Sequence, residues 1–368
     1  MNRKKVLQEK IVREKALTFD DVLLLPNYTD FKRQEVDLTT KLHKKILLKL
    51  PVISAPMDTV TEERMATELA LMGGLGIIHR NLSIEAQALM VKNVKKKKLM
   101  VGAAVGPGID LQERVEALHK IGTDVIVVDS AHGFSKFVID AVAYIKKTFP
   151  SSVVMAGNIA IYEGAKALIK VGTDILRVGM GPGSICTTRI ISGMGVPQIT
   201  AITEAVKAVD KTGVTVVADG GIRQIGDMAK AFAFGASAVM LGSLLAQFDE
   251  SPGEQIVIQG KKYKQYRGMG SIAAMKKGGA ERYGQSRNTD EKKLIPEGIE
   301  GMVEYKGKVA DYLYQIQGSL KSSFYYIGAK TMEEFFKKSK CIRISNAGLL
   351  ESHPHDVTIS NPGDNYTV

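Results

Sequence analysis

Residues 214–243, VTVVADGGIRQIGDMAKAFAFGASAVMLGS, contain the pattern that decides the fold. Two short apolar runs, Val214–Asp219 and Ala238–Gly242, flank a helical stretch. Both runs are apolar on both faces, as expected of parallel strands covered by helices. The stretch therefore predicts one strand–helix–strand unit.

The same unit recurs along the chain, with successive runs starting roughly 22 to 28 residues apart and one gap of about 40 before Val214. Eight such units predict an α/β fold of the (β/α)8 (TIM) barrel type. A doubly wound open sheet is the alternative. The other six predicted strands are Leu50–Met57, Gly74–His79, Met100–Val105, Asp124–Asp129, Ser152–Gly157 and Asp174–Gly179.

The segments between and after the strands vary in length. The helix at Glu62–Leu71 has capping-box spacing between Thr59 and Glu62. Residues 180–198 and 247–306 exceed what a barrel needs, and loops of this length are usually functional lids or disordered. We expect a closing helix from about Lys308 to Leu320, then a polar tail over about 341–368.

The composition is that of a globular intracellular protein. The 368 residues are 45% hydrophobic, no apolar run reaches the ~18 residues of a membrane span, and the N-terminus lacks a secretory pattern. Two cysteines make no disulfide framework and favour a reducing, cytoplasmic compartment. The net charge of +11 favours anionic partners. Scattered basic residues and 6% aromatics make nucleic acid unlikely, so we expect small phosphorylated ligands.

Glycines follow the last two predicted strands. Asp219-Gly220-Gly221 ends the seventh strand, and Gly242-Ser243 ends the eighth. Phosphates in barrels favour the loops after these two strands, where exposed backbone N–H groups can bind oxygen. The alternative is that these glycines only turn the chain. Because the two sites are paired, phosphate binding is the preferred interpretation.

Cys186 lies in a glycine-dense loop after the sixth strand, with hydroxyl residues at 184, 187 and 188. A lone cysteine often only fills space, but this one lies at the catalytic end of the barrel, which favours a nucleophile. A nearby cation or dipole would be needed to form the thiolate. Cys341 lies in an alternating, strand-like run and is interpreted as structural.

These residues extend into longer motifs. The segment Leu176–Thr188 resembles the cysteine-loop signature of the inosine-5′-monophosphate (IMP) dehydrogenase family, which also includes GMP reductase. The resemblance covers nearly the whole chain, through Leu17–Val22, Ala55–Val60, Asp129–Gly133, Tyr266–Ser271, Glu281–Tyr283, Pro296–Gly301 and Glu351–Asp356.

The resemblance implies NAD-dependent oxidation of IMP to XMP, the committed step of guanine nucleotide synthesis. It further implies a covalent cysteine–nucleotide intermediate that is then hydrolysed. GMP reductase, converting GMP to IMP with NADPH, is the alternative within the family. In the dehydrogenases a mobile flap carries an Arg-Tyr pair, and here Arg282-Tyr283 lies in the corresponding long segment, 247–306, which we call the flap. The Glu-Ser-His segment of the tail also resembles the dehydrogenase. Outside the family, a non-catalytic nucleotide-binding barrel and a flavin-dependent oxidoreductase are the alternatives.

The resemblance also implies roles for individual residues. Catalysis is assigned to Cys186, Thr188, Arg282 and Tyr283, with the proton acceptor left open. IMP binding is assigned to Met57, Ser184, Asp219, Gly220, Gly221, Gly242, Ser243, Tyr266, Gly268, Met269, Gly270 and Glu297. NAD binding is assigned to Asp129, Ser130, Ala131, Asn158, Gly179, Met180 and Gly181, with a helix N-cap as the alternative role of Asp129.

A potassium ion is the second cofactor that the resemblance implies. Backbone carbonyls of Gly181, Gly183 and Cys186 would be joined by those of Glu351, Ser352 and His353 from a neighbouring subunit of a homotetramer. Carbonyl rings select potassium by replacing its hydration shell. The alternatives are an inert tail, or zinc at His353 and His355, which lack an obvious further ligand.

One departure from the family is large. Most members insert a pair of regulatory cystathionine-β-synthase-type domains after the second barrel helix, whereas residues 91–100 lead directly into the third strand. We therefore expect one catalytic domain over residues 1–368, without allosteric control through that pair. Smaller departures occur at residues 284–285 and 324–326.

Overall fold

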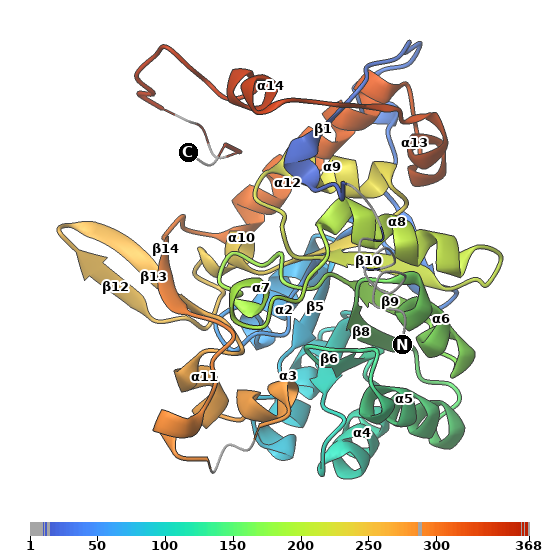
Figure 1. The fold of residues 1–368 in the computed structure, drawn as a ribbon, viewed down its shortest axis with the longest axis vertical. Helices are drawn as coiled ribbons and strands as arrows, with labels where there is room; N and C mark the ends of the chain where they lie inside the picture. The colour runs from blue at the N-terminus through green and yellow to red at the C-terminus, as the bar shows by residue number, and fades with distance from the viewer. Residues whose placement is uncertain are drawn as a thin grey trace.

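The computed structural model describes residues 10, 12, 15–285, 289–361, 363, 365 and 366. Its core is a closed parallel barrel, and the predicted (β/α)8 fold is therefore correct, whereas the open sheet is not (Figure 1). The barrel strands are β4 (Val52–Ser54), β5 (Leu75–Ile78), β6 (Val101–Val105), β7 (Val125–Asp129), β8 (Val154–Ile159), β9 (Ile175–Val178), β10 (Thr215–Asp219) and β11 (Ala238–Leu241). Each falls within or overlaps its predicted run.

Helices follow the strands and cover the outside of the barrel (Figure 1). They are α2 (Glu63–Leu71), α3 (Ile84–Lys96), α4 (Leu111–Lys120), α5 (Lys136–Thr148), α6 (Tyr162–Lys170), α8 (Gln198–Val209), α9 (Ile225–Ala233) and α12 (Val309–Ile327). Residues 97–100 connect α3 directly to β6, so no domain pair is inserted there.

The alternation of side chains along the strands divides the apolar core in two. Ile77, Val127, Ile175 and Val217 belong to a cluster inside the barrel. Their neighbours in sequence, such as Val128, belong to the larger cluster between the strands and the helices. Because both faces are buried, the strands are continuously apolar, and this is the pattern by which they were predicted.

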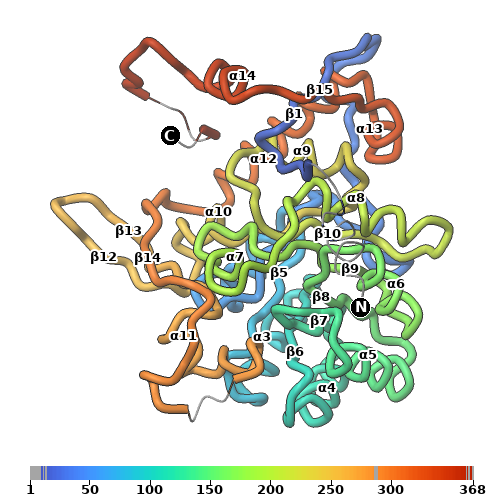
Figure 2. Tube along the Cα trace, viewed as in Figure 1, coloured from blue at the N-terminus to red at the C-terminus, as the bar shows by residue number. Residues whose placement is uncertain are grey.

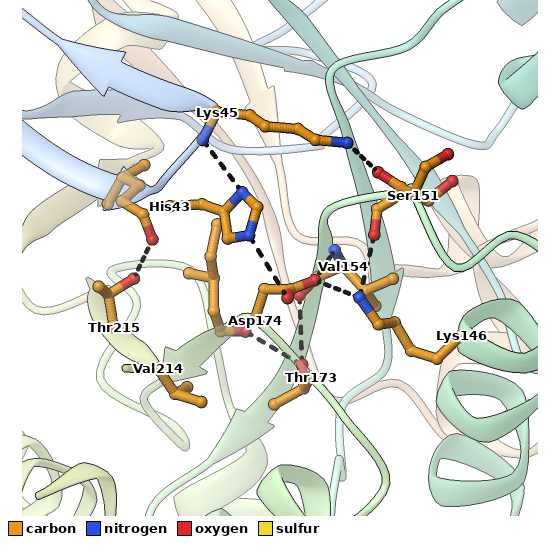
Figure 3. Close-up of polar contacts among 12 residues, drawn as sticks. His43, Lys45, Lys146, Ser151, Val154, Thr173, Asp174, Val214 and Thr215 are labelled. Atoms are coloured by element: carbon orange, nitrogen blue, oxygen red, sulfur yellow. Dashed lines mark hydrogen bonds and ion pairs between the residues drawn. The ribbon is translucent and has the colours of Figure 1, made fainter. Parts of the chain in front are cut away.

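A hairpin that the sequence did not predict closes the amino-terminal end of the barrel. Strands β2 (Thr40–His43) and β3 (Ile46–Leu48) pair antiparallel and place Leu42, Ile46 and Leu48 in the inner cluster. Figure 3 shows the polar contacts that fix it there. Thr215 Oγ1 donates to the Leu42 carbonyl at 2.7 Å, and Lys45 Nζ donates to the Ser151 carbonyl at 2.7 Å.

Asp174 lies at the centre of the polar contacts around this hairpin (Figure 3). Its Oδ2 accepts from the backbone N–H of Val154 at 2.8 Å and from Lys146 Nζ at 2.9 Å. The His43 ring nitrogen Nε2 lies 3.8 Å from Oδ1. Burial lowers the pKa of His43, and the Asp174 charge only partly opposes that effect, so the neutral ring is favoured.

The two long insertions contain regular structure. A short helix, α7 (Thr188–Ile191), lies in the loop after β9. In the flap, β12 (Gln255–Ile258), β13 (Lys261–Arg267) and β14 (Glu300–Glu304) form an antiparallel sheet that projects from the barrel in Figure 1. The sequence did not predict this sheet, because the segment shows little periodicity. Helix α10 (Ser243–Ala246) precedes the flap, which also contains α11 (Ile272–Lys276), η3 (Gly279–Tyr283) and η4 (Glu291–Lys293). Residues 286–288 lie outside the described residues.

Two local expectations are corrected. Helix α12 runs to Ile327 rather than Leu320, because Phe324 and Ile327 continue its buried face and Gly328 ends it with a φ of 71°. Thr59 does not cap α2, whose N-cap is Glu62 without a side-chain bond. Thr59 Oγ1 instead accepts from the backbone N–H of Arg267 at 3.2 Å and so ties the flap to the barrel.

Two segments that are far apart in the sequence pair on the outside of the barrel. After η1 (Phe19–Asp21), β1 (Val22–Leu24) pairs antiparallel with β15 (Cys341–Arg343), which confirms the strand-like run around Cys341. The short helix η2 (Arg33–Glu35) follows β1 in the sequence, and α13 (Met332–Lys338) precedes β15. Helix α14 (Asn346–Glu351) lies in the tail. Figure 2 shows this tail, in red, extending away from the barrel. None of the helices among the described residues is long and apolar enough to cross a membrane.

We expect Asp174→Ala to lower the free energy of unfolding by about 1–3 kcal/mol, because it leaves the buried Val154 N–H without its acceptor. Urea unfolding followed by circular dichroism measures the change. Asp140→Ala is the matched control, since the exposed Lys136 is the one ionic partner of Asp140 among the described residues. Equal midpoints for the two variants would contradict the structural role of Asp174.

Candidate active site

A cavity of about 340 Å³ lies at the carboxyl ends of the barrel strands. It brings together the ends of β4, β7, β8, β9, β10 and β11, the cysteine loop and the flap. Of the residues predicted for substrate, cofactor and catalysis, the cavity is lined by Met57, Ala131, Asn158, Gly179, Met180, Gly181, Gly183, Ser184, Cys186, Thr188, Asp219, Gly220, Gly221, Gly242, Ser243, Tyr266, Gly268, Met269, Arg282, Tyr283 and Glu297.

The cysteine loop is held open to this cavity by the segment that precedes β14. Ile299 N donates to the Ile185 carbonyl at 3.0 Å, and Thr187 N donates to the Glu297 carbonyl at 3.0 Å. Cys186 is half-buried, and its thiol lies 3.2 Å from Thr188 Oγ1. The backbone of the loop thus fixes a thiol and a hydroxyl side by side.

Arg189 is a cation that the sequence did not single out. Burial lowers the pKa of its guanidinium, and the nearby charge of Cys186 opposes that effect. The guanidinium is anchored by Nη2, which donates to the Val196 carbonyl at 2.7 Å. Arg189 is therefore a fixed cation on the same loop as Cys186, and both residues line the cavity.

The two glycine turns follow the neighbouring strands β10 and β11, and both line the cavity. Gly220 has a φ of 88°, and a Cβ there would lie 3.0 Å from Pro182 Cγ, so the turn approaches the loop as only glycine allows. A Cβ on Gly242 would meet the Tyr266 hydroxyl at 2.9 Å and Met57 Sδ at 3.3 Å. The predicted phosphate turns and base-contacting residues therefore converge on one part of the cavity.

Tyr266 connects these parts. It is buried, and burial raises the pKa of its hydroxyl, although hydrogen bonds from the Ser184 side chain and the Ser243 backbone oppose the rise. The neutral hydroxyl thus links the cysteine loop to the turn after β11. This contact joins residues 184, 243 and 266, which the resemblance assigned to one ligand.

A buried ionic cluster forms the other side of the cavity. Asp129, at the end of β7, is 1% exposed and is paired with both Arg177 and Arg282. Arg177 Nε also donates to Asp219 Oδ2 at 2.8 Å, and Asn158 Nδ2 donates to the same oxygen at 2.7 Å. Arg177 therefore bridges the carboxylate assigned to NAD and the carboxylate assigned to IMP.

The charge of this cluster fixes the protonation of Asp129. Burial would raise the pKa of its carboxyl, but the charges of Arg282, Arg177 and Arg80 outweigh it and hold the pKa at about 2. Burial lowers the pKa of Arg282, but the charge of Asp129 and its hydrogen bond, together with Tyr283 and Asp219, outweigh that effect and raise the pKa. The pair is therefore fully ionised at neutral pH.

The flap is docked against the residues predicted for the cofactor. Arg282 contacts Asp129 through its side chain, and its carbonyl accepts from the Ala131 N–H at 3.3 Å. The Tyr283 ring lies against Gly270, where an added Cβ would meet Cζ at 2.7 Å. Burial raises the pKa of Tyr283, with the Arg282 charge opposing it, so its hydroxyl keeps its proton at neutral pH.

Some predicted residues lie at the edge of this arrangement or away from it. Ser130 is buried, with Oγ accepting from the His132 N–H at 3.2 Å. Gly270 does not line the cavity, and it lies against the ring of Tyr283. Glu351, Ser352 and His353 are exposed on the tail, where the Ser352 hydroxyl bonds the Gly348 carbonyl and the His353 ring contacts the Tyr366 hydroxyl. The helix-cap alternative for Asp129 is wrong, because Ser135 caps α5.

Arg177 is the principal residue that the sequence-based prediction missed. A signal was present, because an arginine within the apolar run Ile175–Val178 of a predicted buried strand needs a buried partner. Thr18, Phe19 and Asp20 also line the cavity, although the motif containing them was noted only as a resemblance.

Asp129→Asn is expected to release the flap, because Arg282 and Arg177 lose the charge that compensates them. Hydrogen exchange of the backbone at 279–285 should become faster, and the free energy of unfolding should fall. Since the folded pKa of about 2 lies below the ordinary value of 3.8, this carboxylate stabilises the fold above about pH 4 and loses that effect as the pH falls towards 2.

The measurement is denaturant unfolding at pH 7 and pH 3. Wild type should lose more stability on acidification than Asp129→Asn, which lacks the group. Asp140→Asn, on the exposed side of α5, serves as the control for a general charge effect. Unchanged flap exchange in Asp129→Asn would contradict the role of Asp129 in flap docking.

Comparison with known proteins shows which family this chain is similar to. The model of the IMP dehydrogenase / GMP reductase domain matches residues 16–355. The inosine-5′-monophosphate dehydrogenase of Borreliella burgdorferi is 46% identical, with the match covering 95% of this chain and 99% of that protein. The enzyme of Cryptosporidium parvum is 44% identical, covering 96% and 98%.

A third relative shows how the chains differ in length. The inosine-5′-monophosphate dehydrogenase of Aquifex aeolicus is 40% identical over an alignment of 489 positions, covering 98% of this chain and 99% of that protein. Because this chain has 368 residues, that relative contains segments that are missing here. With the match extending over nearly its full length, the chain belongs to the IMP dehydrogenase / GMP reductase family, in a short form without the inserted domain pair.

Proposed function

We propose that this protein oxidises IMP to XMP with NAD, the committed step of guanine nucleotide synthesis, through a covalent bond between Cys186 and the nucleotide. The observation that carries the proposal is the Cys186 thiol, 3.2 Å from the Thr188 hydroxyl, in the cavity that also contains both glycine turns and the Arg282–Tyr283 pair. One cavity thus contains a nucleophile, backbone N–H groups for a phosphate and a cation for hydrolysis.

The glycine turns and the flap sheet would hold IMP. Gly220, Gly221, Gly242 and Ser243 would bind the phosphate with Ser184, and Asp219 would accept from the ribose hydroxyls. The base would lie between Met57 and the 266–270 segment, with the Glu297 carboxylate accepting from the purine N1–H. The convergence of Gly242, Tyr266 and Met57 supports this arrangement.

Asp129, Ser130, Ala131, Asn158 and the 179–181 backbone would hold NAD, whose nicotinamide ring accepts a hydride. The fit is supported by Asn158 Oδ1, which is buried without a hydrogen-bond partner among the described residues. Cys186 sulfur would bond to C2 of the purine, and the hydride on C2 would then leave to the bound nicotinamide. Nucleophilic catalysis of this kind divides a difficult step into two.

Hydrolysis would need the flap in its docked position. Water adds at C2 and the sulfur leaves, so that XMP and the free thiol are formed. A base must take one proton from the attacking water, and the departing sulfur receives a proton in turn, so the step releases and consumes no net proton. Thr188 is close enough to the sulfur to contact that water. Arg282 has a pKa raised by Asp129, so while paired it acts as a cation beside the reacting water. To act as the base it would first have to leave Asp129.

GMP reductase is the second candidate within the family. The docked Arg282–Tyr283 pair favours hydrolysis, and the named relatives reported above are dehydrogenases. Incubating the protein with GMP and NADPH should therefore release no ammonia. Measurable reductive deamination would reassign it to the reductases.

We further propose that the chain works as one catalytic domain in the cytoplasm. Residues 97–100 join α3 to β6 directly, so control by nucleotides through an inserted pair is not expected. A reactive Cys186 requires reducing surroundings. The second cysteine, Cys341, is exposed on β15 and forms no disulfide with Cys186.

Cys186→Ala should abolish NADH production from IMP and NAD, followed by absorbance, while IMP binding measured by calorimetry is largely retained. The phosphate and ribose contacts lie on other loops, which is why binding survives. Cys341→Ala is the matched control, because that thiol is exposed and far along the chain. Denaturing mass spectrometry of wild type during turnover should show a nucleotide adduct, and turnover by Cys186→Ala would contradict the covalent scheme.

Potassium is proposed as a second cofactor, bound between two subunits of a homotetramer. Backbone carbonyls of Gly181, Gly183 and Cys186 suit a hard monovalent cation, and the left-handed φ of 78° at Gly181 bends the loop tightly. In a single chain the 351–353 segment is exposed and bonded within the tail. A second copy would have to supply that half of the site.

Replacing potassium with sodium or lithium should lower turnover without changing the thermal melting of the barrel. A chain ending at Leu350 should lose both the cation response and most of its activity, since the cysteine loop loses the carbonyls from the partner. A chain ending at Asn361 keeps residues 351–353 and should behave as wild type. Full activity of the shorter chain in potassium-free buffer would contradict the proposal.

A further inference from the structure

Arg80 is a buried cation that the proposed reaction has not used. It follows β5 and is 8% exposed. Its Nη2 is buried and has no hydrogen-bond partner among the described residues. Its Nη1 lies 3.7 Å from Glu281 Oε2, a distance at which charges interact without a hydrogen bond. A buried guanidinium with donors unused is costly unless a ligand satisfies it in the working state.

The loop after β6 is shaped around this side chain. A Cβ on Gly106 would lie 2.7 Å from Arg80 Nη1, so any other residue there would displace the guanidinium. A Cβ on Gly108 would lie 3.1 Å from Glu281 Oε2. Two glycines thus make room for Arg80 and for the carboxylate that faces it.

The charges around Arg80 extend the site already described. Burial lowers the pKa of Arg80, and the Asp129 charge opposes that effect while the Arg282 charge adds to it. Glu281 and Arg282 are neighbours in the flap, and they face Arg80 and Asp129 respectively. The docked flap therefore pairs its anion, Glu281, with the barrel cation Arg80. It pairs its cation, Arg282, with the barrel anion Asp129.

We propose that Arg80 binds the pyrophosphate of the dinucleotide when the flap is away, and that the Glu281 carboxylate occupies the same place when the flap is docked. The inference rests on the proposed use of NAD. A dinucleotide bound with its ribose at Asp129 presents its diphosphate next to that ribose, and a guanidinium with a free fork matches phosphate oxygens. The flap would then mimic both polar groups of the ligand that it replaces.

The test exploits the two partners of one ion pair. Arg80→Gln should weaken binding of ADP-ribose, which carries the pyrophosphate, by about tenfold, and should raise the KM for NAD similarly. Glu281→Gln should tighten ADP-ribose binding several-fold, because the flap competes less well. A merely structural pair would give shifts in the same direction, since either change would loosen the flap.

Calorimetric titration of ADP-ribose into the full chain gives the binding constants without turnover. Arg80→Lys keeps the charge and should restore part of the affinity that Arg80→Gln loses. Thermal melting checks that each variant is folded, and Glu281→Gln, at a partly exposed position, provides an arm in which the barrel is unaltered.

Tighter or unchanged ADP-ribose binding by Arg80→Gln would overturn the proposal, as would weaker binding by Glu281→Gln. The failure of the proposed function would look different. Wild type would then bind ADP-ribose with the opposite shifts in the two variants, but would make no NADH from IMP.

Discussion

The site depends on one buried carboxylate. Asp129 is held ionised in the interior by guanidinium groups from the barrel and from the flap. A buried charge is tolerated only when its counter-charges are in place, so the flap and the barrel are each incomplete without the other. Because Arg177 also bonds Asp219, the same interaction connects the end of β7 to the end of β10.

The barrel could be predicted from the sequence because its information is local. Each strand is a short apolar run, and the regular spacing of the runs implies the closure. The β2–β3 hairpin could not be found this way, since its apolar residues are few and His43, Lys44 and Lys45 interrupt them. The burial of Leu42, Ile46 and Leu48 is explained only by the barrel interior that they enter. Thr59 had the spacing of a cap, but its hydroxyl oxygen instead accepts a hydrogen bond from the backbone N–H of Arg267, 208 residues away.

The site was predictable to the extent that it lies in continuous motifs. The cysteine loop and the glycine turns each occupy one stretch of chain, and the structure brings them to one cavity. Arg177 was missed because its meaning depends on Asp129 and Asp219, 48 and 42 residues away. Arg80 was missed because the opposing Glu281 lies in the flap, whose docking no local pattern predicts.

In the proposed mechanism, the flap has to be held firmly enough to assist hydrolysis and loosely enough to leave for the cofactor. Its two ionic contacts differ in a way that suits both demands. The Arg282–Asp129 pair is buried, whereas the side chain of Glu281 is 39% exposed and its oxygen lies 3.7 Å from Arg80. Partly exposed pairs of this kind contribute little to stability. The firm contact therefore holds Arg282 in the cavity that also contains Cys186, and the weak contact leaves Arg80 available to the anionic ligand proposed above.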